Sequence, residues 1–206
     1  MSITADIFSN ARTKLLLTAE KLFAQRGYEL TSTRHIAGAA GTNISLISYY
    51  FGSKQLLYRE IFCTRLKEMV ISLQCIKGQP LSAIDKLGRF LMIYMDSYRL
   101  NGNFQRMLYR EMLSLSPSPI RDTIVDFLAE NEMVFQAIMA QGIAEGDFRP
   151  LNTSFYYITL ISMLSMIICD VQVDGDMPAQ TYTTDEIRTY LYQILLANSN
   201  STSSMN

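Results

Sequence analysis

Glycine and proline, the residues that interrupt helices, are few in this chain and stand far apart. Ten Gly and five Pro occur among 206 residues, and the long segments between them are rich in Leu, Ile, Met, Ala, Lys, Glu and Gln. Most of these residue types favour helices. We therefore expect an all-α fold, and a hydrophobic content of 49% is enough for a packed core.

The beginning of the chain contains two helix patterns. Apolar residues recur at helical spacing between Asn10, the expected N-cap, and Gly27, the expected stop. A second, shorter pattern runs from Thr33, again the expected cap, to Gly41. The first helix is expected to support the second.

A third short helix is expected at residues 44–50, with Asn43 as its cap. The small residues Ala37 and Ala40 lie where the second helix must approach its neighbours, and Gly41 lies in the turn. Two short helices joined by a turn that contains Gly form a helix-turn-helix, whose second helix enters the major groove of DNA. Residues 1–54 are therefore predicted to be an N-terminal three-helix DNA-binding domain.

A larger C-terminal helical domain is predicted at residues 55–198. Ser53 can cap a long connecting helix that reaches about Gln74. The tail, residues 199–206, consists mostly of Ser, Asn and Thr and is expected to be disordered. Further helices are expected near residues 81–100, 103–114, 118–145, 153–173 and 183–198.

Charge is distributed unevenly between the two predicted domains. The whole chain has a formal net charge of −1, but residues 1–54 hold six Lys or Arg against three acids. The remainder holds twelve bases against sixteen acids. This asymmetry suits a front domain that binds a polyanion and a back domain that does not.

Few residues are available for catalysis, metal binding or disulfides. The chain has one His and three Cys (Cys63, Cys75 and Cys169), with no CxxC pair, no Gly-rich phosphate loop and no GxSxG elbow. We therefore expect no enzyme activity, no cofactor and no metal site, in a protein of the reducing cytoplasm. Cys63 and Cys75 are expected to be buried. We expect neither a signal peptide nor a membrane span.

The run TSTRHIAGAAGTNISLISYYFGSKQLLYREIF, residues 31–62, resembles the DNA-binding signature of the tetracycline-repressor (TetR) family of transcriptional regulators. The preceding helix is similar to the family too, whereas the rest of the chain matches in helix layout only. The chain departs from the common pattern at Asn43, where the family usually has Ser, and at Ser45 and Ser48, where it often has Gly and Tyr. The matching residues are Thr31, Ile36, Ala37, Ala40, Gly41, Leu46, Tyr50, Phe51, Ser53, Lys54, Leu56 and Leu57.

The resemblance and the chemistry of the residues together indicate the contacts to double-stranded operator DNA. The N-terminal residues of the recognition helix lie nearest the base edges, so Ile44, Ser45 and Tyr49 are the expected base-reading residues. For one of Tyr49 and Tyr50, packing inside the domain is an equal alternative. Phosphate contacts are expected from helix N-termini, hydroxyl groups and cations, namely Thr33, Arg34, Asn43, Tyr50 and Lys54.

The resemblance also implies a ligand-responsive repressor that binds a palindromic operator. Its last two helices would pair with their copies in a homodimer, and the helix near residues 153–173 is apolar on more faces than a lone surface helix should be. An unidentified small-molecule effector would bind among the Met and aromatic residues of the preceding helices and release the DNA. The expected ligand-binding residues, for each of which ordinary packing or exposure to water is the alternative, are Met95, Tyr98, Arg99, Met107, Arg110, Phe127, Phe135 and Met139.

Two other functions are alternatives. A redox-responsive regulator would use the cysteines, but Cys63 and Cys75 would lie about 18 Å apart along one helix, too far for a mutual disulfide. A non-enzymatic helical adaptor would keep the dimer and lose operator binding.

Overall fold

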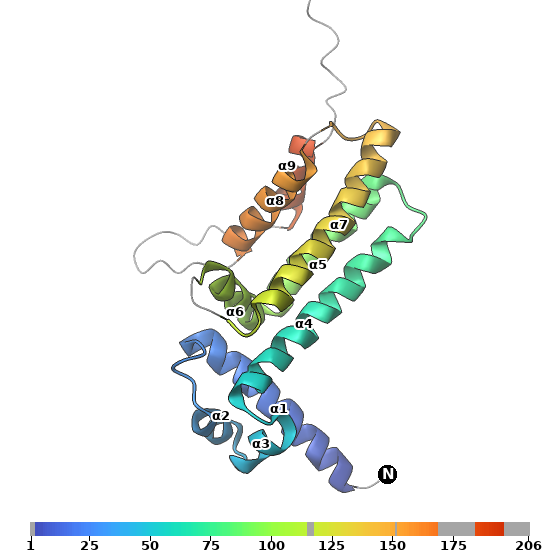
Figure 1. Ribbon diagram of the computed structural model, residues 1–206. Helices are drawn as coiled ribbons and strands as arrows, with labels where there is room; N and C mark the ends of the chain where they lie inside the picture. The colour runs from blue at the N-terminus through green and yellow to red at the C-terminus, as the bar shows by residue number, and fades with distance from the viewer. Residues whose placement is uncertain (1–2, 115–117, 151, 169–183, 196–206) are drawn as a thin grey trace, which may run out of the picture. The chain divides into compact units, whose positions relative to one another are not determined.

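The computed structural model describes residues 3–114, 118–150, 152–168 and 184–195. Within these ranges the regular elements are α-helices (Figure 1), which confirms the expected all-α fold. Residues 169–173 of one predicted helix and the predicted disordered tail lie outside the described residues. The helices are α1 (Ile3–Arg26), α2 (Thr33–Ala40), α3 (Ser45–Phe51), α4 (Lys54–Lys77), α5 (Ala83–Leu100), α6 (Gly102–Leu113), α7 (Arg121–Glu145), α8 (Thr153–Ile168) and α9 (Thr184–Leu195).

The chain divides into two compact units. Unit 1 comprises Met1–Glu68 and Asn101–Phe127, and therefore holds α1 to α3, most of α4, α6 and the start of α7. Unit 2 comprises Met69–Leu100 and Leu128–Asn206, with the end of α4, α5, the rest of α7, α8 and α9. Unit 1 thus contains the predicted helix-turn-helix and, in addition, α6. A boundary between functional domains at residue 54 remains a proposal.

Glycines in the left-handed region end the first two helices, as expected. Gly27 has φ 81° and follows α1, and Gly41 has φ 62° and follows α2. Glycine adopts this conformation at little cost because it lacks Cβ. The predicted start of α1 at Asn10 is wrong, since the helix begins at Ile3.

The N-caps of the short helices differ partly from the prediction. The helix expected at residues 44–50 is Ser45–Phe51, with Ile44 and not Asn43 at its cap position, although Asn43 Oδ1 accepts from Ser45 N. Ser32, and not Thr33, caps α2, because Ser32 Oγ accepts a hydrogen bond from His35 N at 3.1 Å. Thr33 is the first residue of the helix. The two residues are neighbours with similar side chains, so a sequence pattern cannot separate them. The expected cap at the start of α4 is confirmed, since Ser53 Oγ accepts from Leu56 N at 3.1 Å.

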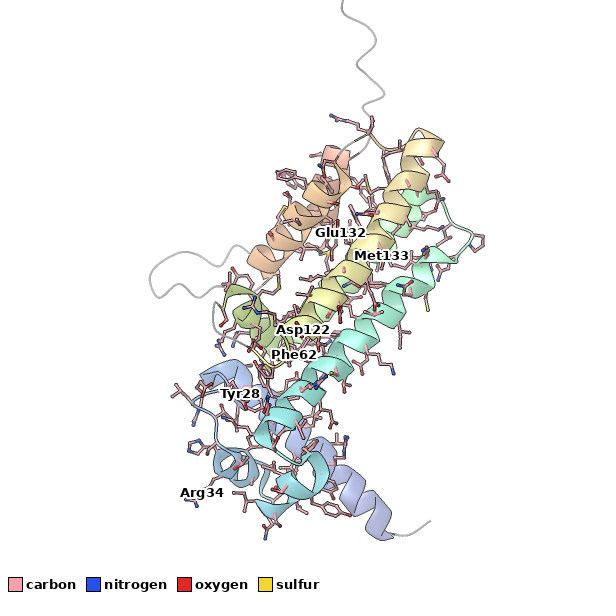
Figure 2. All side chains as sticks on the ribbon, in the orientation of Figure 1. Tyr28, Arg34, Phe62, Asp122, Glu132 and Met133 are labelled. Carbon is pink, nitrogen blue, oxygen red and sulfur yellow. The ribbon has the colours of Figure 1, made fainter. Side chains whose placement is uncertain are left out.

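The core of unit 1 is a chain of aromatic rings that joins α1, α4 and α6. Phe23 of α1 packs edge-on against Tyr58 of α4, with ring centroids 4.9 Å apart. Tyr58 continues to Phe62 at 5.1 Å, and Phe62 continues to Phe104 of α6 at 5.2 Å. Burial of such rings supplies most of the energy that holds helices together. Figure 2 labels Phe62 on α4.

A buried ion pair also fixes α1 to α4. Glu20 Oε2 accepts from Arg65 Nη2 at 3.1 Å and from Arg65 Nε at 3.2 Å. The Glu20 side chain is only 6% exposed. Removal of Arg65 alone would leave a buried charge unpaired, so the pair holds the two helices in one register.

Unit 2 packs α5 against α8 and α9. Tyr192 of α9 donates from Oη to Ile84 O of α5 at 3.2 Å. Gly142 of α7 lies against the buried ring of Phe148, which folds back beyond the helix end. The lack of a side chain at Gly142 makes this close approach possible.

The expected burial of the cysteines on α4 is wrong. Cys63 and Cys75 both lie on α4, as expected, but both are exposed free thiols and not buried. They fall outside the buried positions of α4, such as Phe62 and Ile76, and only the packing of the unit decides which side of a helix is covered. None of the helices in the described ranges is long and apolar enough to cross a membrane.

Candidate nucleic-acid interface

The short helix α3 has one buried and one exposed face. Ile47 and Phe51 are 1% and 5% exposed and anchor the helix on unit 1. Ser45, Ser48 and Tyr49 are exposed, and Tyr49 is 75% exposed. A helix held from behind with a polar and aromatic face turned outward has the form of a recognition helix.

Small side chains bring α2 close to its neighbours. Ala37 and Ala40 are buried together with Ile36, as expected from their spacing. The loop before α2 is fixed by Thr31, whose Oγ1 donates to Gly27 O at 2.7 Å. Thr31 is completely buried, which explains its place in the signature. These contacts hold α2 and α3 on α1.

The expected base-reading residues all lie at the surface. Ile44 is 46% exposed immediately before α3, beside Ser45. Asn43 Oδ1 accepts from both Ser45 N and Ser45 Oγ, each at 2.9 Å. The hydroxyl proton of Ser45 is therefore engaged, and its oxygen is left to accept from a base edge, such as an adenine or cytosine amino group. The Asn43 amide nitrogen carries donors suited to phosphate.

The expected phosphate contacts fall into two groups. Arg34 is exposed and its side chain points away from α2 into solvent (Figure 2), and Thr33 is half-buried. Lys54, in contrast, donates from Nζ to Tyr28 O at 3.0 Å and lies 4.0 Å from the centroid of the Tyr28 ring. Tyr50 Oη is buried and has no hydrogen-bond partner among the described residues. Tyr50 therefore reaches a phosphate only if its side chain moves, whereas Lys54 keeps two further N–H donors.

Two residues of this surface were not predicted. Ser48 is exposed one helical turn after Ser45, so the helical period alone could have identified it. Ser32 is exposed at the N-terminus of α2, where backbone N–H groups favour anions. Among the described residues, no group of three or more His, Cys, Asp or Glu could hold a metal ion.

The eight expected ligand-binding residues are divided between the two units. Met107, Arg110 and Phe127 belong to unit 1, whereas Met95, Arg99, Phe135 and Met139 belong to unit 2. The side chain of Tyr98 lies outside the described residues. The five apolar ones are buried, from 0% exposed at Phe135 and Met139 to 7% at Met95.

The two arginines of this set have protein partners. Arg110 donates from Nη1 to Phe23 O at 3.0 Å and from Nη2 to Ala24 O at 3.2 Å, so it caps the C-terminal end of α1. Arg99 lies 3.5 Å from Asp96 and is exposed. Neither contact requires a ligand.

The helical fold and the supported helix-turn-helix with its outward face have the form of a DNA-binding protein. Comparison with protein families identifies the family. Residues 15–61 match the model of bacterial regulatory proteins of the tetR family. Residues 80–194 match the tetracyclin repressor-like C-terminal domain. The chain therefore belongs to the TetR family, as its signature indicated.

The chain is similar to several known regulators. It is 27% identical over 161 residues to the probable HTH-type transcriptional regulator YttP of Bacillus subtilis, covering 76% of each chain. It is 28% identical over 143 residues to the HTH-type transcriptional repressor KstR2 of Mycolicibacterium smegmatis, covering 69% of each. The solved structure of the ketosteroid transcriptional regulator KstR2 of Mycobacterium tuberculosis has the same fold, with a TM-score of 0.78, 21% identity and coverage of 90% of this chain and 95% of that one. These relatives are named as transcriptional regulators and not as enzymes.

Proposed function

We propose that this protein is a ligand-responsive repressor, which binds a palindromic operator as a homodimer and leaves it when a small molecule binds to residues 55–198. The observation that carries the proposal is the face of α3 that exposes Ser45, Ser48 and Tyr49 while Ile47 and Phe51 hold the helix from behind. Repression is the function named for the KstR2 relatives.

Base reading on this face is expected to be modest. Tyr49 and Ile44 can pack against thymine methyl groups, and Ser45 can accept from an amino group, which is a weaker code than Arg bound to guanine. Arg34, the Asn43 amide nitrogen and the N-terminus of α2 would bind phosphates and set the position of the helix. Much of the affinity would therefore be electrostatic and sensitive to salt.

The proposed dimer uses α8 and α9. One face of α8 is buried in unit 2 through Tyr157, Leu160 and Leu164. Phe155 and Ile158 lie elsewhere on the same helix and are 71% and 60% exposed. Large apolar side chains exposed one turn apart favour contact with a second copy. A Phe155→Glu, Ile158→Glu double variant should therefore be monomeric in sedimentation, whereas Lys67→Gln should remain a dimer.

The proposed response to the effector is a shift between two dimer conformations. One conformation places the recognition helices about 34 to 36 Å apart, which matches successive major grooves. The effector favours another spacing and so weakens DNA binding. Reciprocity requires that DNA weakens effector binding by the same factor.

Operator binding is tested by fluorescence anisotropy on the DNA upstream of the protein's own gene, beside scrambled DNA of equal length, over a salt series. Ser45→Ala and Tyr49→Ala should each cost about 0.5–1.5 kcal/mol on the specific fragment, as expected for single contacts, and much less on scrambled DNA. Arg34→Gln should weaken binding to both fragments and reduce the salt slope by about one. Lys67→Gln, an exposed cation on α4, is the control and should change neither.

The outcomes separate the proposal from its alternatives. Equal binding to both fragments would place the operator elsewhere, and selection from random DNA would then identify it. A folded dimer that binds no DNA in either experiment would contradict the proposal and favour a helical adaptor. The exposed thiols of Cys63 and Cys75 are the observation that favours a redox-responsive regulator. That alternative requires a thiol oxidant to change the affinity for the operator. In a Cys63→Ser, Cys75→Ser variant, the oxidant should then have no effect on that affinity.

A further inference from the structure

Asn131 lies deep in unit 2 without a full set of hydrogen bonds. It is 1% exposed, in the part of α7 that belongs to unit 2. Its Nδ2 donates to Tyr94 Oη at 3.0 Å, but its Oδ1 has no hydrogen-bond partner among the described residues. Turning the amide over would exchange the positions of Oδ1 and Nδ2. In the observed orientation the amide oxygen has no donor, which is costly in a protein interior.

The hydroxyl that meets this amide belongs to a pair of tyrosines on two other helices. Tyr94 Oη of α5 lies 3.3 Å from Tyr157 Oη of α8, which also donates to Leu128 O at 3.3 Å. Burial raises the pKa of Tyr157 to about 12, so this hydroxyl keeps its proton at neutral pH. We name Tyr94, Asn131 and Tyr157 the Asn131 cluster. It joins α5, α7 and α8 with polar groups and carries no charge of its own.

Aromatic rings surround the Asn131 cluster. The ring of Phe90 lies 5.0 Å from that of Tyr94 and 5.4 Å from that of Phe135, between ring centroids. Phe135 also packs against Tyr157 at 5.7 Å and stacks on Tyr156 at 6.0 Å. The Tyr156 hydroxyl is a second buried polar group without a partner among the described residues.

Flexible side chains lie on the same helices. Met95 is adjacent to Tyr94 on α5, and Met139 lies one turn beyond Phe135 on α7. Both are buried, and methionine can repack to admit a guest because its chain is unbranched. The helices that carry the Asn131 cluster therefore combine buried, adaptable apolar side chains with polar atoms that lack partners among the described residues.

We propose that the Asn131 cluster is the polar end of the effector site and that it takes a small, mostly apolar molecule with one neutral hydroxyl group. The hydroxyl bonds to the unpaired atom of Asn131, and because a hydroxyl both donates and accepts, it fits either orientation of the amide. An anionic group is disfavoured here, because it would be buried near the carboxylate of Glu132, whose charge helps to raise the pKa of Tyr157. This inference rests on the proposed function, which requires an effector but assigns none of these three residues to it.

The test uses pairs of probes that differ only in the hydroxyl group: beta-naphthol with beta-methylnaphthalene, and menthol with menthane. Calorimetric titration of the full-length protein at neutral pH measures their affinities. The hydroxyl member of at least one pair should bind about five- to tenfold more tightly, as expected for one hydrogen bond to a buried neutral group. In Asn131→Leu, which removes the amide and keeps the number of side-chain heavy atoms, the two members should bind equally.

A control and a second variant keep the test decisive. Gln136→Leu removes an amide further along α7 whose side chain is exposed and bonded to Glu132 and Ser154, and it should leave the hydroxyl preference unchanged. If circular dichroism shows that Asn131→Leu does not fold, Asn131→Ala removes the same polar atoms without a risk of overpacking.

Three results would overturn the proposal: equal affinity of both members for the unmodified protein, a hydroxyl preference that survives in the Asn131 variants, or no binding of any probe. Operator binding, measured on the same preparation, separates this inference from the proposed function. Operator binding without the hydroxyl preference rejects the effector site alone. A hydroxyl preference without DNA binding rejects the proposed repressor function and retains the proposed effector site.

Discussion

Arg110 connects α6 to the C-terminal end of α1, and its removal should measurably destabilise the protein. Its guanidinium donates to Phe23 O at 3.0 Å and to Ala24 O at 3.2 Å. Both carbonyls lie in the last turn of α1, at the negative end of the helix dipole, and residues Phe23 and Ala24 are 1% and 0% exposed. In Arg110→Met the side chain keeps its apolar stem and loses every donor.

The expected loss can be worked out from these contacts. A hydrogen bond from a charged donor contributes about 1.5–3 kcal/mol where water is excluded. Arg110 itself is exposed, so water competes and about 0.5–1 kcal/mol for each of the two bonds is the better figure. The helix dipole adds about 0.3 kcal/mol. The free energy of unfolding should therefore fall by about 1.5 kcal/mol, which corresponds to a decrease of roughly 3–6 °C in Tm for a chain of this size.

Urea unfolding followed by far-ultraviolet circular dichroism, at one fixed protein concentration, measures this loss. Arg106→Met is the matched control, because Arg106 is exposed on the same helix, and it should change stability by less than about 0.5 kcal/mol. Arg110→Lys should recover only part of the loss, since an ammonium group cannot reach two carbonyls with a planar fork. Equal losses in Arg110→Met and Arg106→Met would refute the reasoning, and full recovery in Arg110→Lys would show that charge alone matters.

Three further predictions concern stability. Burial raises the pKa of Tyr157 from 10.0 to about 12, so the stability from this group is complete below pH 10 and is lost between pH 10 and pH 12. Between pH 9 and pH 11, the free energy of unfolding measured in urea should therefore fall by about 1 kcal/mol more in the unmodified protein than in Tyr157→Phe. Equal decreases in the two proteins would contradict the raised pKa of Tyr157. Gly142→Ala would place Cβ 2.1 Å from the buried ring of Phe148 and should lower the free energy of unfolding by about 1–3 kcal/mol. An unchanged free energy of unfolding would contradict this prediction. Gly38→Ala, at an exposed position inside α2 with nothing within 4 Å, should instead raise stability by about 0.5–1 kcal/mol in the same assay, and a loss would show that the short helix is strained.

Helix α3 shows which features of a candidate functional site a sequence pattern can predict. The helical period identifies Ile47 and Phe51 as the inner face and therefore Ser45 and Tyr49 as the outer face. It cannot decide between Tyr49 and Tyr50, which are adjacent at the edge of the two faces. The structure separates them, with Tyr49 exposed and the Tyr50 hydroxyl buried.

The sequence by itself determined the all-α class, the stops at Gly27 and Gly41, the helix-turn-helix and the family, because periodicity and left-handed glycines act over a few residues. Only the tertiary structure decided the partners of the polar side chains. Arg110 and Phe23 are 87 positions apart, and Asn131 meets Tyr94 across 37. Asn131 stands in an apolar pattern between Phe127 and Phe135, so its burial could be suspected from the sequence, but its unpaired atom could not. Contacts across such separations depend on how whole helices pack, which no local pattern records.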